Sequence, residues 1–341
     1  MKNFATHQRK SDHIKISLNE NVSSSLSTGL EKVRFNHQAL PEISFEEIDP
    51  SLVLLGKTIS FPLLISSMTG GTPKAGVINR NLALAAEKMK VGLALGSQRA
   101  AIEDPALART FKIRDIAPSI PLFANLGAIQ LNYGFTLDEC KHAVEMVQAD
   151  GLILHLNPLQ EVLQPEGQTN FRGLIQKIQF ICKNLNYPVI VKEVGSGISA
   201  RVAKILSEAG VWAVDVAGAG GTSWSQVEKF RAENEDNAQI AEAFCDWGIS
   251  TMESIRFTRR AAPRLKVIAS GGLRSGVDMA KCIALGADLC GIALPFLKAA
   301  IVSSEAVEKV IGIYRKQFKI AMFASGTSNL KELSRIQLIE T

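Results

Sequence analysis

Hydrophobic runs and helical patterns alternate along most of this chain. Eight short apolar runs lack the polar alternation of a half-exposed strand, as expected of parallel strands that are buried on both faces. Amphipathic helical spacing separates most of these runs. Such alternation predicts an α/β fold, a (β/α)8 TIM barrel with an N-terminal extension and a C-terminal helix, and an open doubly wound sheet is the alternative. We expect the strands at 63–66, 91–95, 121–124, 151–154, 188–191, 211–216, 267–270 and 289–294.

Polar capping residues mark several of the expected helices. Thr136 and Glu139 have capping-box spacing, and Ser199 stands at the start of a later helix. A last amphipathic helix is expected at 302–324. Residues 225–238 are charged and have no periodicity, which favours a solvated loop over a lid.

The N-terminal part does not follow the strand–helix pattern. We expect one domain, in which 1–60 form an arm and a barrel-closing segment and 61–341 form the barrel. The stretch at 40–59 suits short strands that close the barrel floor. The motif RKSDH contains Arg9 and Lys10, which could clamp a phosphate if the arm folds over a site. A charge cluster near a terminus is, however, more often a solvated tail.

The composition limits the classes of function. With 46% hydrophobic residues and 26 glycines, the 341 residues can form one barrel with extensions. The formal charge of +5 is a mild excess without basic runs, which favours a small anionic substrate over nucleic acid. No stretch approaches the ~20 apolar residues of a membrane span, and the first residues lack the core of a signal peptide, so we expect a cytoplasmic protein. Five cysteines without a CxxC pair indicate buried thiols in a reducing compartment.

Polar side chains and glycines follow nearly every expected strand. In a barrel the carboxyl ends of the strands meet at one face, where catalytic groups lie. The set has amides, hydroxyls and cations but few carboxylates and no nucleophile–base pair, so we expect a bound cofactor to carry the chemistry. Its members are Thr69, Ser97, Arg99, Asn125, His155, Asn157, Gln160, Glu161, Lys192, Asp215, Thr222 and Arg274.

Several of these positions have more than one interpretation. Gly271 and Gly272 follow the seventh strand, where a barrel commonly binds phosphate, but they also suit a tight turn. Lys192 could form a Schiff base, stay charged beside the N1–O2 edge of a flavin, or only form a salt bridge. Glu161 could bind Mg²⁺ together with a diphosphate, or merely cap the following segment. His155 is more typical of a phosphate donor than of a metal ligand, because no second histidine is near it.

A series of motifs runs in order from Arg9 to Phe296: RKSDH, ALPEI, SSMTGG, GSQR, NLGAIQ, HLNPLQE, VKEVGSG, GAGGTSW, SGGLRSG and ALPF. With these motifs the chain resembles the type 2, flavin-dependent isopentenyl-diphosphate isomerases. GSQR or SGG alone would be weak. The combination of RKSDH with HLNPLQE and GGTSW is specific, because related FMN barrels lack it.

The resemblance implies a site for FMN, a substrate diphosphate and Mg²⁺. Gln160 and Lys192 would be catalytic, Gln160 would face the reacting carbons, and Glu161 would bind Mg²⁺. The FMN ring and ribityl chain would meet Ser67, Met68, Thr69, Ser97, Asn125, Lys192 and Thr222. The FMN phosphate would meet Gly271, Gly272, Arg274, Ala293 and Leu294. The substrate would be bound by Arg9, Lys10, Ser97, Gln98, Arg99, His155, Asn157 and Gln160.

The implied reaction moves the double bond of isopentenyl diphosphate to give dimethylallyl diphosphate, with no net redox change and with FMN kept reduced by NADPH. A homotetramer or homo-octamer is also implied. The enzymatic alternative is an FMN oxidoreductase of the 2-hydroxyacid oxidase or inosine monophosphate dehydrogenase type. The alternative from another class is a flavin-binding barrel without catalysis.

Overall fold

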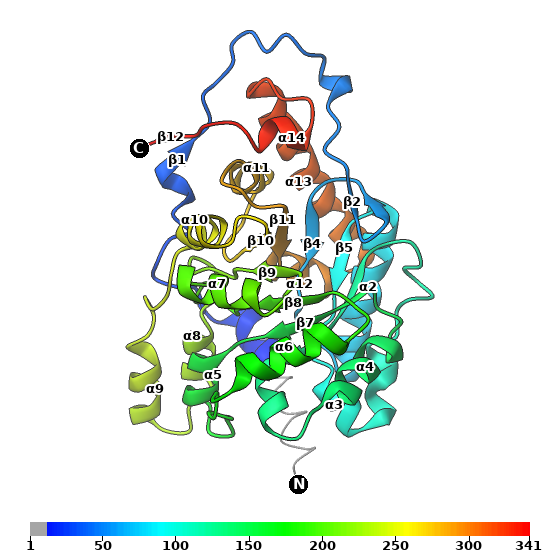
Figure 1. Ribbon diagram of the computed structural model, residues 1–341, viewed down its shortest axis with the longest axis vertical. Coiled ribbons are helices and arrows are strands. Elements are labelled where there is room, and N and C mark those ends of the chain that lie inside the picture. Colours follow the sequence, from blue (N-terminus) through cyan, green and yellow to red (C-terminus); the bar gives the residue numbers. More distant parts are fainter. Residues whose placement is uncertain (1–11) are drawn as a thin grey trace.

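Eight parallel strands close into a barrel at the centre of the molecule (Figure 1). The computed structural model describes residues 12–341. The strands follow chain order around the barrel, and pairing of the last with the first completes it. The predicted (β/α)8 fold is therefore confirmed, and the open sheet is excluded. The strands are β4 (Leu63–Ile65), β5 (Gly92–Ala94), β6 (Leu122–Gly127), β7 (Gly151–His155), β8 (Val189–Lys192), β9 (Ala213–Asp215), β10 (Lys266–Ser270) and β11 (Leu289–Ile292).

Helices surround the barrel and pack against the outward-facing side chains of its strands (Figure 1). The predicted caps are confirmed: Thr136 and Glu139 form a capping box, and the Ser199 side chain accepts a hydrogen bond from the backbone N–H of Val202. The longer helices are α2 (Pro73–Met89), α4 (Leu137–Met146), α6 (Leu174–Asn184), α7 (Ala200–Glu208), α10 (Thr251–Ala261), α11 (Gly276–Ala284) and the predicted final amphipathic helix, α13 (Ser304–Ala324).

Shorter elements connect these units. Residues 12–19 are helical. No helix in the described part of the chain is long and apolar enough to cross a membrane. The short helices are α3 (Arg99–Glu103), α5 (Pro158–Leu163), α12 (Leu294–Ala300) and α14 (Leu330–Leu333), with 3-10 turns at Leu30–Lys32, Phe45–Glu47, Pro105–Thr110 and Ala128–Asn132. Strand β1 (Val33–Arg34) pairs with β12 (Ile339–Glu340).

Residues 225–238 are only in part the solvated loop that their charges predicted. They form α8 (Trp224–Lys229) and the start of α9 (Glu235–Glu242); most of α8 is buried, whereas 233–237 are exposed. The prediction was wrong for α8, where Glu228 is buried and forms an ion pair with Arg231. A sequence pattern cannot distinguish a buried, paired charge from a solvated one.

An apolar inner core fills the amino-terminal half of the barrel. The hairpin of β2 (Leu52–Leu54) and β3 (Lys57–Ile59) adds Leu54 and Ile59 to this core. Two short strands therefore occur within the stretch at 40–59, and the hairpin covers this end of the inner core. Each barrel strand contributes one inward-facing residue to the inner core: Leu64, Ala94, Phe123, Ile153, Ile190, Ala213, Ile268 and Leu289.

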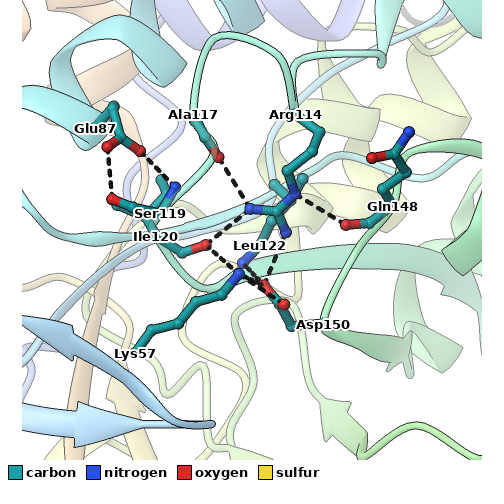
Figure 2. Close-up of polar contacts among 9 residues, drawn as sticks. All are labelled: Lys57, Glu87, Arg114, Ala117, Ser119, Ile120, Leu122, Gln148 and Asp150. Carbon is teal, nitrogen blue, oxygen red and sulfur yellow. Dashed lines mark hydrogen bonds and ion pairs between the residues drawn. The ribbon is translucent and has the colours of Figure 1, made fainter.

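A polar cluster fixes the hairpin to the amino ends of the strands (Figure 2). Asp150, just before β7, accepts hydrogen bonds from Lys57 Nζ (2.7 Å), Arg114 Nη2 (2.8 Å) and the backbone N–H of Leu122 (2.8 Å). Lys57 and Arg114 each also donate to the carbonyl of Ile120 at 3.0 Å. One carboxylate thus connects the floor, the segment before β6 and the start of β7.

Candidate functional site

The next inward layer of the barrel, toward the carboxyl ends of the strands, is polar. Side chains on one face of a strand recur every second residue, so this layer lies two positions after the inner core. Together the eight positions form what we call the polar ring. All of them except Asp215, which is 1% exposed, line a cavity of about 270 Å³. The polar ring consists of Ser66, Gly96, Asn125, His155, Lys192, Asp215, Ser270 and Gly291.

The cavity brings together nearly all of the predicted site residues. Arg9 and Lys10 lie outside the described residues, and Gln98 does not line the cavity. The predicted residues that do line it are Ser67, Met68, Thr69, Ser97, Arg99, Asn125, His155, Asn157, Gln160, Glu161, Lys192, Thr222, Gly271, Gly272, Arg274, Ala293 and Leu294.

The structure does not support the expectation that the Gln98 side chain binds the substrate. Its side chain is fully buried, with Nε2 donating to the carbonyl of Ala143 (2.8 Å) and Oε1 accepting from the backbone N–H of Asn125 (2.9 Å). Both ends of the amide are therefore occupied by backbone partners. Gln98 fixes the carboxyl end of β6 and so positions Asn125.

The loops after β10 and β11 form a small-residue wall that fits a phosphate. Gly271 and Gly272 have φ angles of +105° and +76°, and an added Cβ would lie 2.0 Å from Gly218 O and 2.2 Å from Gly220 O. The glycines are thus required by close contact with the β9 loop as well as by the turn. Arg274 lines the same wall, and within the described residues its guanidinium contacts the Leu273 carbonyl (3.2 Å) and no carboxylate. An unpaired cation beside a glycine-rich backbone suits a phosphate such as that of FMN.

Three titratable residues of the polar ring lie on neighbouring strands. Lys192 is in register with His155 on β7 and with Asp215 on β9. His155 Nδ1 is 3.0 Å from Asn125 Oδ1, and Asn125 Nδ2 donates to Ser67 Oγ at 2.9 Å. A hydrogen bond to this oxygen requires the His155 tautomer that carries its proton on Nδ1. Lys192 brings a positive charge to the cavity wall beside these amide and hydroxyl groups, a set that fits a flavin.

A chain of hydrogen bonds fixes Gln160 between two buried carboxylates. Gln160 Nε2 donates to Glu228 Oε1 (2.9 Å), and Gln160 Oε1 accepts from Asn157 Nδ2 (3.1 Å). Asn157 Nδ2 also donates to Glu161 Oε1 (2.9 Å). A carboxylate accepts hydrogen bonds and cannot donate them, so the two ends of the chain determine which way each amide faces.

The charge on Glu228 is stabilised by cations. Burial opposes that charge, but the hydrogen bond and charge of His13 and the charge of Arg231 outweigh burial and lower the pKa of Glu228. His13 Nε2 lies 3.2 Å from Glu228 Oε1, and its ring packs edge-on against Trp224 with 5.0 Å between ring centroids. Glu228 and His13 were not assigned to the site from the sequence. His13 stands in the RKSDH motif, which was the available signal, whereas Glu228 had none.

The comparisons with known proteins identify the family. Residues 148–340 match the family model described as FMN-dependent dehydrogenase. An isopentenyl-diphosphate delta-isomerase from Nostoc sp. is 52% identical over 96% of this chain and 94% of its own length. The chain belongs to the isopentenyl-diphosphate delta-isomerase family. Family members from Rickettsia bellii and Rickettsia prowazekii are 50% and 47% identical, each over 97% of both chains. The FMN-dependent family model agrees with the type 2 class of these isomerases.

Solved structures confirm the fold of this isomerase family member and nothing finer. A mandelate oxidase with (S)-2-phenylpropionate is 17% identical and has a TM-score of 0.69 over 96% of this chain and 94% of its own. A second mandelate oxidase structure has 16% identity and a TM-score of 0.68, over 96% and 95%. The five cysteines all fall within the described residues, and none lines the cavity. The cavity therefore has no thiol of the kind that the inosine monophosphate dehydrogenase alternative needs.

The surroundings of Glu161 in this isomerase family member fit a hard cation. Glu161 is buried, and no group of three or more His, Cys, Asp and Glu side chains that could hold a metal occurs in residues 12–341. A divalent cation here would thus depend on one carboxylate and on a second ligand such as a diphosphate. Two buried oxygens nearby, Asn157 Oδ1 and Gln164 Oε1, have no hydrogen-bond partner among residues 12–341, and both residues line the cavity. Oxygen acceptors without donors are the groups that Mg²⁺ and its bound waters prefer.

Proposed function

We propose that this protein interconverts isopentenyl diphosphate and dimethylallyl diphosphate, with reduced FMN and Mg²⁺ bound and NADPH as the reductant. The carrying observation is the hydrogen-bond chain that holds Gln160 on the cavity wall between Glu228 and Glu161. A barrel that only stored flavin would not need the Gln160 amide held in one orientation. It would also not need buried oxygen acceptors, such as Asn157 Oδ1, that are left without hydrogen-bond donors in the described residues. Sequence identity of about half the residues with named isomerases supports the same conclusion.

The FMN phosphate would bind at Gly271, Gly272 and Arg274, next to Ala293 and Leu294. The isoalloxazine ring and ribityl chain would lie across the polar ring, against Asn125 and Lys192 and the residues predicted with them: Ser67, Met68, Thr69, Ser97 and Thr222. Bound reduced FMN supplies an electron-rich ring and an acid–base group beside the substrate. Lys192 would then place a fixed positive charge against the ring.

The substrate diphosphate would be held by cations and donors of the loops that follow β5 and β7. Arg99, His155 and Asn157 line the cavity there, and Arg9 and Lys10 are predicted to join them. Glu161 would bind the Mg²⁺ that bridges to the diphosphate oxygens. Because diphosphate is the best leaving group of the substrate, anchoring its charge keeps the C–O bond intact while the double bond moves.

The chemistry that these residues support is redox-neutral. A proton adds to the terminal alkene carbon and another leaves C2, so the positive charge that develops at C3 must be shielded from water. Trp224 and His13 cover one side of the cavity, and the segment that follows His13 pairs with the β9 loop through a bridge between Ser23 and Thr222. Gln160, held by Glu228, would face the reacting carbons and orient them without exchanging charge itself.

An anaerobic assay tests this proposal. Purified protein is supplied with isopentenyl diphosphate, FMN, NADPH and Mg²⁺, and dimethylallyl diphosphate is counted against the NADPH consumed. Many product molecules per NADPH support the isomerase, whereas one-to-one consumption supports an oxidoreductase. Q160A and E161Q are each expected to lose at least 100-fold in kcat while FMN stays bound. Full activity in either variant would remove that residue from the mechanism.

We also propose a cytoplasmic homotetramer or homo-octamer. Several large apolar side chains on neighbouring outer helices are exposed, among them Val77 on α2 and Ile313 and Ile320 on α13. Burial of these side chains between subunits would remove them from water. Light scattering coupled to size exclusion tests the assembly, and a monomeric mass would contradict it.

A further inference from the structure

The polar ring contains one charged residue that the proposed chemistry does not use. Asp215 is 1% exposed, does not line the cavity, and is the ring's only carboxylate. Its Oδ1 accepts hydrogen bonds from Ser270 Oγ (2.5 Å) and from the backbone N–H of Ala217 (3.2 Å). A buried carboxylate is costly unless another charge compensates it.

Lys192 is the matching positive charge. The two residues are register partners on β8 and β9, so their side chains lie on the same, inner face of the barrel. Lys192 is itself 8% exposed, and its Nζ donates to the carbonyl of Glu193 at 2.5 Å, which satisfies a proton but supplies no negative charge. Among the described residues, the hydrogen bonds to Asp215 reach Oδ1. Burial raises the pKa of Asp215, and the charge of Lys192 is the largest of the effects that oppose this rise.

Glu193 does not take this role. It is the first residue after β8 (Val189–Lys192), and its carboxylate is held by the loop that follows. Its Oε2 accepts from the backbone N–H groups of Val194, Gly195 and Ser196 at 2.5–2.6 Å, which fixes the β8 loop. Within the described residues, Asp215 is the carboxylate that shares the inner face of the polar ring with Lys192.

We propose that Asp215 is the buried counter-charge of Lys192 and sets how strongly the site favours reduced over oxidised FMN. Reduced FMN can carry one more negative charge than oxidised FMN, so its affinity rises with the net positive charge beside the ring. Asp215 cancels part of the Lys192 charge and acts through Lys192 without contacting the cavity. This inference rests on FMN binding at the polar ring, which belongs to the proposed function.

The first test measures the midpoint potential of bound FMN against a reference dye. D215N is expected to raise the ratio of reduced-to-oxidised FMN affinity about tenfold, which corresponds to a rise of about 30 mV for a two-electron couple. K192M is expected to shift the potential in the opposite direction. D288N is the matched control, because Asp288 pairs with Arg259 at the amino end of β11. An unchanged or lowered potential in D215N, or an equal rise in D288N, would overturn the proposal.

The second test does not require FMN. Urea unfolding of the apo forms of D215N, K192M and the double variant measures their coupling by a double-mutant cycle. Each single variant leaves one buried charge without its partner. The unfolding equilibrium constant of the double variant is therefore expected to be at least tenfold smaller than the value calculated when the two single effects are independent. Additive effects would overturn the pairing. If FMN fails to bind the wild-type protein but the double-mutant cycle shows coupling, the proposed function is wrong and the pairing of Asp215 with Lys192 is still supported.

Discussion

Replacing Glu228 by glutamine tests how the catalytic amide is held. The wild-type carboxylate is 1% exposed and receives hydrogen bonds from Gln160 Nε2, His13 Nε2 and Arg231 Nη1. Glutamine has nearly the same volume but presents an NH₂ group at one of the two positions. Because every partner is a donor there, at least one contact becomes a donor–donor clash.

The magnitude follows from burial and from the remaining partners. Removing one member of a buried ion pair typically costs about 3–5 kcal/mol. Arg231 is 14% exposed and keeps its ion pair with Glu166 at 2.9 Å, so part of its charge stays compensated. We therefore expect E228Q to lower the free energy of unfolding by about 2–3 kcal/mol at pH 7. Misorientation of Gln160 should also lower kcat about 10–100-fold with FMN retained, the range seen when a supporting partner is lost.

The loss of stability should depend on pH. The folded-state pKa of Glu228 lies below its ordinary value of 4.5 because His13 and Arg231 outweigh the opposing effect of burial. Its contribution to stability is therefore complete above pH 4.5 and is lost as pH falls through the folded pKa. Urea unfolding of wild type and E228Q from pH 7 down to pH 3 should show two curves that converge at acid pH.

The neighbouring carboxylate provides the control. Glu166 shares Arg231 but its side chain is 37% exposed, so E166Q should cost less than about 1 kcal/mol. A stability difference between wild type and E228Q that is below 0.5 kcal/mol, using the scale of a surface substitution, would refute the reasoning. So would a difference that does not change between pH 7 and pH 3.

Two further predictions concern other parts of the barrel. G271A should destabilise by about 2 kcal/mol or more and weaken FMN binding, because its Cβ would meet Gly218 O at 2.0 Å and its φ is +105°. G312A, in the middle of α13 with nothing within 4 Å of an added Cβ, should instead stabilise by about 0.5–1 kcal/mol, and equal urea midpoints for the two variants would contradict the packing argument. D150N should lower the free energy of unfolding by about 2 kcal/mol, because it weakens the contacts at the barrel floor. The affinity for FMN should not change, since this cluster lies at the opposite end of the barrel from the cavity. A weaker FMN complex would show that the two ends are coupled.

Some features of the fold and the site could be predicted from the sequence because they depend on residues that are close together in the chain. The succession of strands and helices along the chain, the caps at Thr136 and Ser199, and the glycine loop at 271–272 follow from local periodicity and backbone conformation. The residues at the strand ends could also be predicted to belong to the site, because a closed barrel brings the carboxyl end of every strand to one face.

The positions of the Gln98 and Glu228 side chains could not be predicted in this way. Gln98 belongs to a motif at a strand end, yet its side chain turns to the backbone of Ala143 and Asn125 and never reaches the cavity. Glu228 looked like part of a solvated charged loop and instead supports Gln160 from inside the protein. In both cases the deciding partner is distant in the sequence.

The sequence by itself determined that this chain forms eight strand–helix units and which strand ends carry polar chemistry, because periods of two and 3.6 residues and capping contacts are local properties of the backbone. Only the tertiary structure decided which of these side chains meet. Pairing of β8 with its two neighbouring strands places Lys192 between His155 and Asp215, and the β9–α10 segment brings Glu228 to Gln160 across 68 positions. The physical reason is that register and burial, which set charge pairing and the direction of each amide, arise only when distant segments pack together.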